Sequence, residues 1–287
     1  MAHITDAEVK AIEAKACAIR ETIIEMLTEA KSGHTAGPLG MTDIFSALYF
    51  HIAKHNPKDP EWQERDYIIL SNGHIAPVRY ATMAHAGYFP IEEATKTLRK
   101  FGTRLQGHPE PHALPGLETT SGPLGSGLSQ ASGIAYALRM DGKKNRVYCL
   151  LSDGEMQSGN TWEAGMWAGK YKLANLVGII DRNNIQINGM TEDVMPLESL
   201  KAKWEAFNWH VLEIDGHNIE AIVDACEEAK AVYEKPVMII AHTIPGKGVP
   251  EIEFDYTWHG KPPKPEEAER FLKNIRTCGG RVPNEYA

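Results

Sequence analysis

The chain has 287 residues, a formal net charge of −8 at pH 7 and a pI near 5.9. This length can bury a sizeable core, and the acidic balance without clustered Lys and Arg argues against nucleic-acid binding. The four cysteines, Cys17, Cys149, Cys226 and Cys278, lie far apart and form no CxxC pair. We therefore expect reduced thiols rather than a zinc site or a disulfide framework.

The N-terminal sequence MAHITDAEVK contains early acidic residues and lacks the apolar core of a signal peptide. The longest uncharged run, residues 119–138, is rich in Gly and Ser rather than in lipid-facing side chains. These features predict a cytoplasmic protein that contacts no membrane.

Helical patterns of apolar residues recur along the chain. Ile12, Ile19 and Ile23 have the spacing of an amphipathic helix over 6–31, which we expect to end before Gly33. Further helical patterns cover residues 41–53, 76–86, 91–100, 127–140, 160–173, 197–207, 218–234 and 265–276.

Short apolar, β-prone runs alternate with these helices. They cover residues 67–71, 147–151, 176–180, 210–214 and 237–242. Such continuous runs suit strands that are covered on both faces, and the alternation predicts an α/β fold with a doubly wound, mainly parallel sheet and helices on both faces. We expect residues 1–287 to form a single domain, in which 243–287 make an extended C-terminal arm over the surface and a helix.

Two polar motifs follow neighbouring predicted strands. The motif SDGE at 152–155 follows one strand, and DRNNI at 181–185 follows the next. If these strands are parallel, Asp153, Asn183 and the Ile185 carbonyl meet at the sheet edge where α/β proteins bind ligands. Oxygen donors of this kind suit Mg²⁺ held together with a diphosphate. Either motif alone is more often an ordinary turn or polar loop.

Four histidines lie in loops rich in Gly or Pro: His34, His74, His108 and His259. His74 follows the first predicted strand, and an imidazole there can donate to phosphate or transfer protons near neutral pH. The loop 119–127 precedes a helix, and its glycines let the backbone approach a flat ligand closely. Taken singly, a histidine is more often a surface or hydrogen-bonded residue, and such a loop is more often a turn.

Together these motifs resemble the N-terminal half of transketolase. The matching segments, in order, are SGHTAGPLG at 32–40, LSNGH at 70–74, GHPE at 107–110, TSGPLGSGLS at 120–129, SDGE with WEA within 152–164, DRNNIQING at 181–189 and WHGKPP at 258–263. They span nearly the whole chain, and WHGKPP is more typical of transketolases than of other thiamine enzymes. The thiamine diphosphate motif of the family begins with Gly-Asp-Gly, and Ser152 replaces its first Gly.

The resemblance implies the thiamine diphosphate-binding fold, with thiamine diphosphate and Mg²⁺ as cofactors, the metal being replaceable by Ca²⁺ or Mn²⁺. It implies that Asp153, Asn183 and the Ile185 carbonyl bind the metal. The cofactor-binding residues it implies are His74, Gly122, Pro123, Leu124, Asp153, Gly154, Asn183 and His259. The catalytic residues it implies are His34, His108 and His259, which would line the substrate channel and move protons on the sugar.

The implied activity is transfer of a two-carbon ketol unit from a ketose or ketose phosphate to an aldose, through a carbanion on thiamine diphosphate, as in the pentose phosphate pathway. A full transketolase continues into pyrimidine-binding and C-terminal domains, whereas this sequence stops at Ala287. We therefore expect one subunit of a split enzyme, with a partner chain that supplies the activating carboxylate and the phosphate-binding arginines, in an α2β2 assembly. A phosphorylated pentose, a branched sugar phosphate or a sulfonated sugar all fit as substrate.

Two positions depart from the family pattern. Thr35-Ala36-Gly37 follows His34 where Thr or Ser with Pro is usual, and Ser158 replaces a frequent Glu. The second change places in question the proton-transfer or dimer-contact role of that Glu. The alternatives are the α subunit of a thiamine-dependent 2-oxo acid dehydrogenase, and a noncatalytic thiamine diphosphate-binding subunit.

Overall fold

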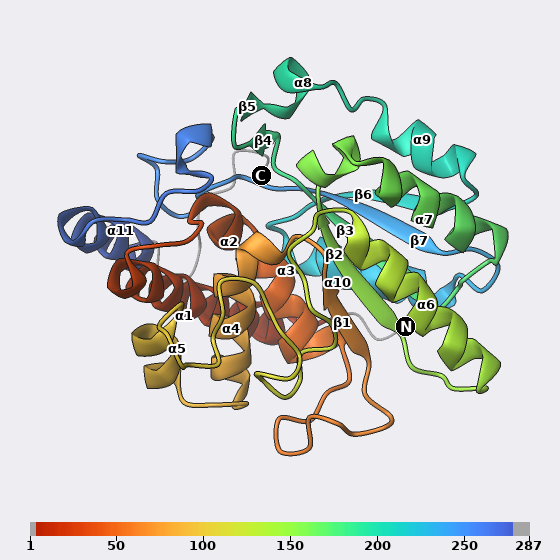
Figure 1. Cartoon of the computed structure of the whole chain (residues 1–287), viewed down its shortest axis with the longest axis horizontal. Helices are drawn as coiled ribbons and strands as arrows, with labels where there is room; N and C mark the ends of the chain where they lie inside the picture. The colour runs from red at the N-terminus through yellow and green to blue at the C-terminus, as the bar shows by residue number, and fades with distance from the viewer. Residues whose placement is uncertain (1–3, 278–287) are drawn as a thin grey trace.

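The centre of the computed structural model, which describes residues 4–277, is a five-stranded sheet in the order β1-β2-β3-β7-β6 (Figure 1). Every neighbouring pair of its strands is parallel. The strands are β1 (Tyr67–Leu70), β2 (Val147–Ser152), β3 (Leu176–Arg182), β6 (His210–Asp215) and β7 (Val237–His242). The predicted strands and their parallel arrangement are confirmed.

Each face of the sheet carries its own hydrophobic cluster. In β2, Tyr148 and Leu150 join one cluster, and Cys149 and Leu151 join the other. The first cluster includes α1 (Asp6–Ala30), α3 (Thr42–Ala47), α4 (Ala76–Ala86) and α10 (Ile219–Ala231). The second includes α6 (Ser126–Met140), α7 (Gly159–Lys170) and α9 (Leu200–Ala206). The alternation of side chains along each strand therefore produces the predicted doubly wound fold.

Several helices differ from the predicted ranges. The pattern over 41–53 is divided between α3 and a π-helical turn, η1 (Leu48–Ile52), and α5 (Ile91–Thr97) ends before Arg99, whose φ is 58°. The short elements not predicted are α2 (Ala36–Gly40), η2 (Gly73–Ile75), η3 (Gly154–Gln157), the β4–β5 hairpin (Ile185–Gln186 and Gly189–Met190), α8 (Thr191–Val194) and η4 (Tyr256–Trp258). Elements this short carry no hydrophobic period.

The segment 243–264 does not begin as the expected surface arm. Ile244, Lys247 and Val249 are buried, so its first part passes through the interior. The chain then reaches α11 (Pro265–Thr277), which packs against α1. Residues 278–287 of the predicted arm lie outside the described residues. Between residues 4 and 277, no helix is both long and apolar enough to span a membrane.

Candidate active site

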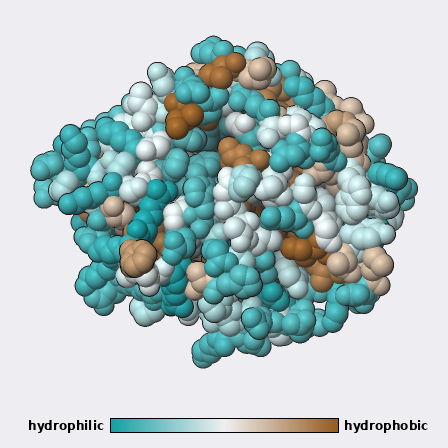
Figure 2. Space-filling model, viewed as in Figure 1, coloured by the Kyte–Doolittle hydropathy of each residue, from teal (hydrophilic) through white to brown (hydrophobic). Residues whose placement is uncertain are grey.

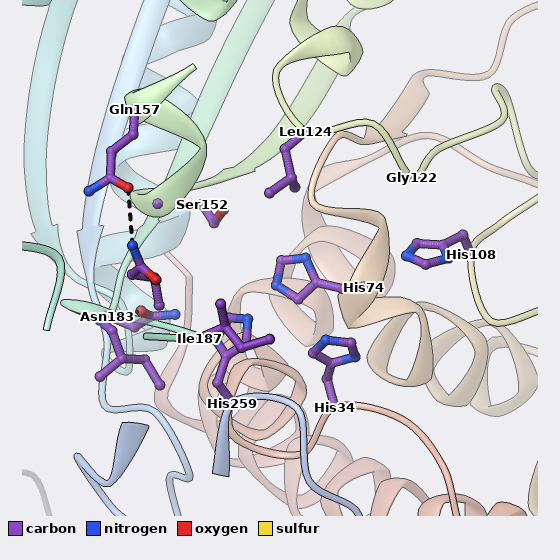
Figure 3. Close-up of a pocket in the computed structure, with 13 residues that line it drawn as sticks. His34, His74, His108, Gly122, Leu124, Ser152, Gln157, Asn183, Ile187 and His259 are labelled. Carbon is purple, nitrogen blue, oxygen red and sulfur yellow. Dashed lines mark hydrogen bonds between the residues drawn. The ribbon is translucent and has the colours of Figure 1, made fainter. Parts of the chain in front are cut away.

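A cavity of about 340 Å³ lies at the carboxyl edge of the sheet (Figure 3). Its lining residues are His34, His74, His108, Gly122, Leu124, Ser152, Gly154, Gln157, Asn183, Ile185, Gln186, Ile187 and His259. The volume is that of a small-molecule site. All predicted site residues line it except Asp153, which is fully buried beside Gly154, and Pro123, which is exposed.

Three histidines from distant parts of the sequence form a cluster on one wall of the cavity. The ring centroids of His34 and His74 are 5.0 Å apart, those of His34 and His259 5.4 Å, and those of His74 and His259 5.1 Å (Figure 3). The Thr35 hydroxyl donates to the Lys261 carbonyl at 2.6 Å, which ties the loop after His34 to the loop after His259. His108 lies apart from this cluster, beyond His34 and His74 on the side away from Asn183 (Figure 3).

The clustered histidines are held in the neutral state. Burial lowers the pKa of His34 to about 4, with His259, Arg99 and His108 contributing further. Burial also lowers the pKa of His74 well below its ordinary value, and lowers the pKa of His259. A neutral imidazole has one donor and one acceptor nitrogen, so each ring can accept or deliver a proton. The Nδ1 atom of His34 is buried without a hydrogen-bond partner.

Arg99 supports two of the histidine loops, although sequence reasoning gave it no role. Its Nη1 donates to the Ser32 hydroxyl at 2.9 Å, and its Nη2 donates to the Gly107 carbonyl at 3.5 Å. The loops before His34 and His108 are thereby joined. The positive charge of Arg99 also lowers the pKa of both histidines, after the larger effect of burial.

Glu155 is a second supporting residue, to which the sequence pattern assigned no role. Its fully buried carboxylate accepts hydrogen bonds from the Ser71 hydroxyl, from Gly125 N at 2.6 Å and from Ser152 N at 3.1 Å. It therefore joins the ends of β1 and β2 to the loop that enters α6. That loop carries Gly122 and Leu124 to the cavity. Burial raises the pKa of Glu155, and these hydrogen bonds oppose the rise.

The Asp153 carboxylate lies directly after β2 and has three donors. Arg182 Nη1 donates to it at 3.0 Å, Asn184 N at 2.7 Å and Gly154 N at 2.7 Å. Burial raises the pKa of Asp153 to about 6, and the Arg182 guanidinium opposes this rise without cancelling it.

Asn183 is oriented by a buried neighbour that the sequence did not identify. Asn183 Nδ2 donates to Asp181 at 2.7 Å, and the amide oxygen of Asn183 accepts from Ile185 N at 3.0 Å. The Thr243 hydroxyl donates to the other oxygen of Asp181. Burial raises the pKa of Asp181 to about 7, and the Thr243 hydroxyl lowers it. Asp181 and Thr243 thus fix the amide that faces the cavity.

Known proteins similar to this chain match most of its length. A sequence model of the family described as "Transketolase, thiamine diphosphate binding domain" matches residues 12–279. The chain is 44% identical to the 6-deoxy-6-sulfo-D-fructose transketolase subunit SqwG of a Clostridium species, over 83% of this chain and 86% of that protein. It is 39% identical to one of the subunits of the apulose-4-phosphate transketolase of Phocaeicola vulgatus, over 93% of this chain and 95% of that protein.

A solved structure of transketolase from Pichia stipitis in complex with sedoheptulose 7-phosphate superposes with a TM-score of 0.89 and 31% identity. It covers 93% of this chain, and the chain spans only 41% of it. Transketolase from Leishmania mexicana superposes with a TM-score of 0.88 and 34% identity, over 96% of this chain and 42% of that one. The extent of these matches shows that the chain belongs to the transketolase family, as a thiamine diphosphate-binding domain of that thiamine-dependent enzyme.

Proposed function

We propose that the chain is the N-terminal subunit of a split transketolase, which transfers a two-carbon ketol unit from a ketose to an aldose. The observation that carries this proposal is the cavity itself. It brings neutral histidines from three loops to the strand ends where Asp153 and Asn183 supply oxygen donors. The family match does not support the alternative of a 2-oxo acid dehydrogenase subunit.

The donor set around Asp153 fits a divalent cation. Asp153 and Asn183 follow the neighbouring strands β2 and β3, and Asn183 and Ile185 line the cavity. Within residues 4–277, no group of three or more His, Cys, Asp or Glu side chains is placed to hold a metal. A mixed set of one carboxylate, one amide oxygen and one carbonyl, completed by phosphate and water, suits Mg²⁺ better than a transition metal. We assign Asp153, Asn183 and the Ile185 carbonyl to it, with Ca²⁺ or Mn²⁺ as substitutes.

The remaining walls fit thiamine diphosphate. Gly122 has a φ of +146°, which favours glycine at the cavity wall, and at Gly154 a Cβ would make only an ordinary contact with Gln186 Cβ at 3.4 Å. We place Gly154, His74 and His259 at the diphosphate, and Gly122, Pro123 and Leu124 at the aminopyrimidine. When bound, the cofactor supplies the nucleophilic carbon that accepts the ketol unit. His34, His108 and His259 bind the sugar hydroxyl and carbonyl oxygens and move their protons.

The names of the relatives indicate anionic sugars as substrates. One relative is named for a sulfonated ketose and another for a ketose phosphate. No Lys or Arg is among the residues that line the cavity in the described chain. We therefore propose an anionic ketose donor whose charged end is held by the partner subunit.

A partner subunit is expected because the chain matches subunits along most of their length but spans only 41–42% of the solved transketolases. We propose that the C-terminal subunit docks on the α6–α7 face, in an α2β2 assembly. Met166 and Trp167 are 51% and 37% exposed there, and hydrophobic atoms are visible on this side of the molecule (Figure 2). A groove of about 290 Å³ between the helices contains the Ser132 hydroxyl, which is buried without a hydrogen-bond partner.

The test is ketol transfer by the chain and the subunit that copurifies with it, supplied with thiamine diphosphate and Mg²⁺. Xylulose 5-phosphate and 6-deoxy-6-sulfofructose are the donors, and ribose 5-phosphate is the acceptor. We expect transfer that Asp153→Ala abolishes and Asp59→Ala, on an exposed loop, leaves intact. Bound cofactor without transfer from either donor would contradict the proposal and favour a noncatalytic subunit. Full turnover by the chain alone would contradict the split enzyme.

A further inference from the structure

Arg182 occupies an unusual position at the end of β3. Its side chain is buried, and one guanidinium donates four hydrogen bonds. Nη1 donates to Asp153 at 3.0 Å and to the Thr191 hydroxyl at 2.9 Å. Nη2 donates to Glu192 at 2.8 Å and to Glu198 at 2.9 Å. A single side chain therefore joins the carboxylate of the candidate metal site to both ends of the segment 191–198.

The segment 191–198 lies next in the chain to residues that line the cavity, although it does not line the cavity itself. It follows the β4–β5 hairpin, where Ile185, Gln186 and Ile187 line the cavity. A second anchor is Gln157, whose Nε2 donates to the Met195 carbonyl at 2.8 Å. Arg182 thus holds this segment at its two ends and Gln157 holds it near its middle, while Lys203 Nζ donates to the Leu197 carbonyl at 2.5 Å.

The three carboxylates that pair with Arg182 differ in their exposure to solvent. The Asp153 side chain is fully buried, whereas the side chains of Glu192 and Glu198 are 39% and 54% exposed. A divalent cation on Asp153 would place a second positive charge near the guanidinium. The cation and the guanidinium would repel each other strongly where water is excluded. The two glutamates offset that repulsion because they neutralise the guanidinium from the other side.

We propose that Arg182 is a positioning residue that couples metal loading at Asp153 to the order of segment 191–198. This inference rests on the proposed function. Before loading, Arg182 holds the Asp153 carboxylate in place. After loading, it binds Glu192 and Glu198 more tightly and holds the segment against Gln157, which lines the cavity. Because coupling between two sites is reciprocal, the two glutamates strengthen metal binding without touching the metal.

The first measurement is hydrogen exchange of the backbone amides in 191–198, on the cofactor-free chain. We expect Arg182→Met to raise the exchange rate in this segment at least tenfold. Arg182→Lys should raise the rate by a smaller factor, because Lys can reach some of the four acceptors but not all of them. Unchanged exchange in Arg182→Met would overturn the inference.

The second measurement is the Mg²⁺ affinity in the presence of thiamine diphosphate, by titration of tryptophan fluorescence on the chain with any subunit that copurifies. We expect Glu192→Gln/Glu198→Gln to weaken Mg²⁺ binding at least threefold, and the same pair to change it less than twofold in an Arg182→Met background. These glutamates are partly exposed, so the double variant should fold, and its weaker Mg²⁺ binding tests their contribution even if Arg182→Met folds poorly.

The control is Lys203→Met, which removes the hydrogen bond from Lys203 Nζ to the Leu197 carbonyl and lies outside the cavity lining. It should raise exchange in 191–198 without changing the effect of the glutamate pair on Mg²⁺ binding. If the wild-type protein binds Mg²⁺ but the two glutamate substitutions weaken that binding equally with Arg182 in place and in the Arg182→Met background, the coupling is overturned and the proposed function is not. Failure of the wild-type complex to bind Mg²⁺ and thiamine diphosphate would overturn the proposed function and the coupling with it.

Discussion

Glu155 provides the sharpest test of how the fold holds the cofactor loop. Its carboxylate is fully buried and accepts from Gly125 N and Ser152 N as well as from the Ser71 hydroxyl. In Glu155→Gln the shape is kept, but one acceptor oxygen becomes an NH₂ group that faces a buried donor. The variant therefore loses one hydrogen bond and leaves a donor without a partner.

The expected cost follows from these contacts. A buried donor left without an acceptor costs about 1–3 kcal/mol, so Glu155→Gln should lower the free energy of unfolding by roughly 2 kcal/mol. Glu155→Ala leaves Gly125 N and Ser152 N both unsatisfied and should cost roughly 2–6 kcal/mol by the same reasoning. Because Gly125 N is in the loop of Gly122 and Leu124, thiamine diphosphate binding should weaken in the same order.

The assay is urea unfolding followed by tryptophan fluorescence, with thiamine diphosphate affinity measured in parallel. The matched control is Glu205→Gln on the exposed side of α9, which should change the unfolding free energy by less than about 0.5 kcal/mol. An unfolding free energy of Glu155→Gln within the range of this control would refute the reasoning.

Three further predictions concern the histidine cluster, the cofactor loop and the partner face. Burial lowers the pKa of His34 to about 4 from an ordinary value of 6.5, so its neutral form stabilises the fold above pH 6.5. This contribution to the unfolding free energy, about 3 kcal/mol, is lost as the pH falls toward 4. When unfolding is measured against pH, His34→Gln should lose less stability than the wild type on acidification, and parallel curves for the two proteins would contradict the prediction. In Gly73→Ala the new Cβ would lie 2.7 Å from Ser121 Oγ and 2.9 Å from Gly122 N. We expect the unfolding free energy to fall by about 1–3 kcal/mol and cofactor binding to weaken. The control Gly159→Ala, whose Cβ would have no atom within 4 Å, should change neither the unfolding free energy nor cofactor binding. Met166→Lys on α7 should abolish copurification of the partner while the chain stays folded. The control is Tyr233→Lys, since Tyr233 lies after α10, is 83% exposed and should not affect copurification. Chromatography of the coexpressed subunits measures this, and an intact complex with Met166→Lys would exclude the α6–α7 face as the docking surface.

The sequence by itself determined the strands and the strand-end motifs. Continuous apolar runs such as LVGII at 176–180 suit inner strands of a sheet that is covered on both faces, so their pattern predicts both the strand and its burial. Asp153 and Asn183 follow such runs directly, and their meeting at one edge required only that the strands be parallel. The histidine loops were identified by their resemblance to transketolase rather than by a pattern in the residues alone.

Only the tertiary structure decided which side chains support those motifs. Arg182, Glu155 and Arg99 act through contacts with residues far away in the sequence, and the partners depend on strand order and register. The same holds for Thr243, which reaches Asp181 because β7 lies beside β3 although six elements of the chain, β4, β5, α8, α9, β6 and α10, come between them. A charged residue beside a turn looks the same in the sequence whether it is solvated or buried, since its surroundings are set by packing and not by its neighbours along the chain.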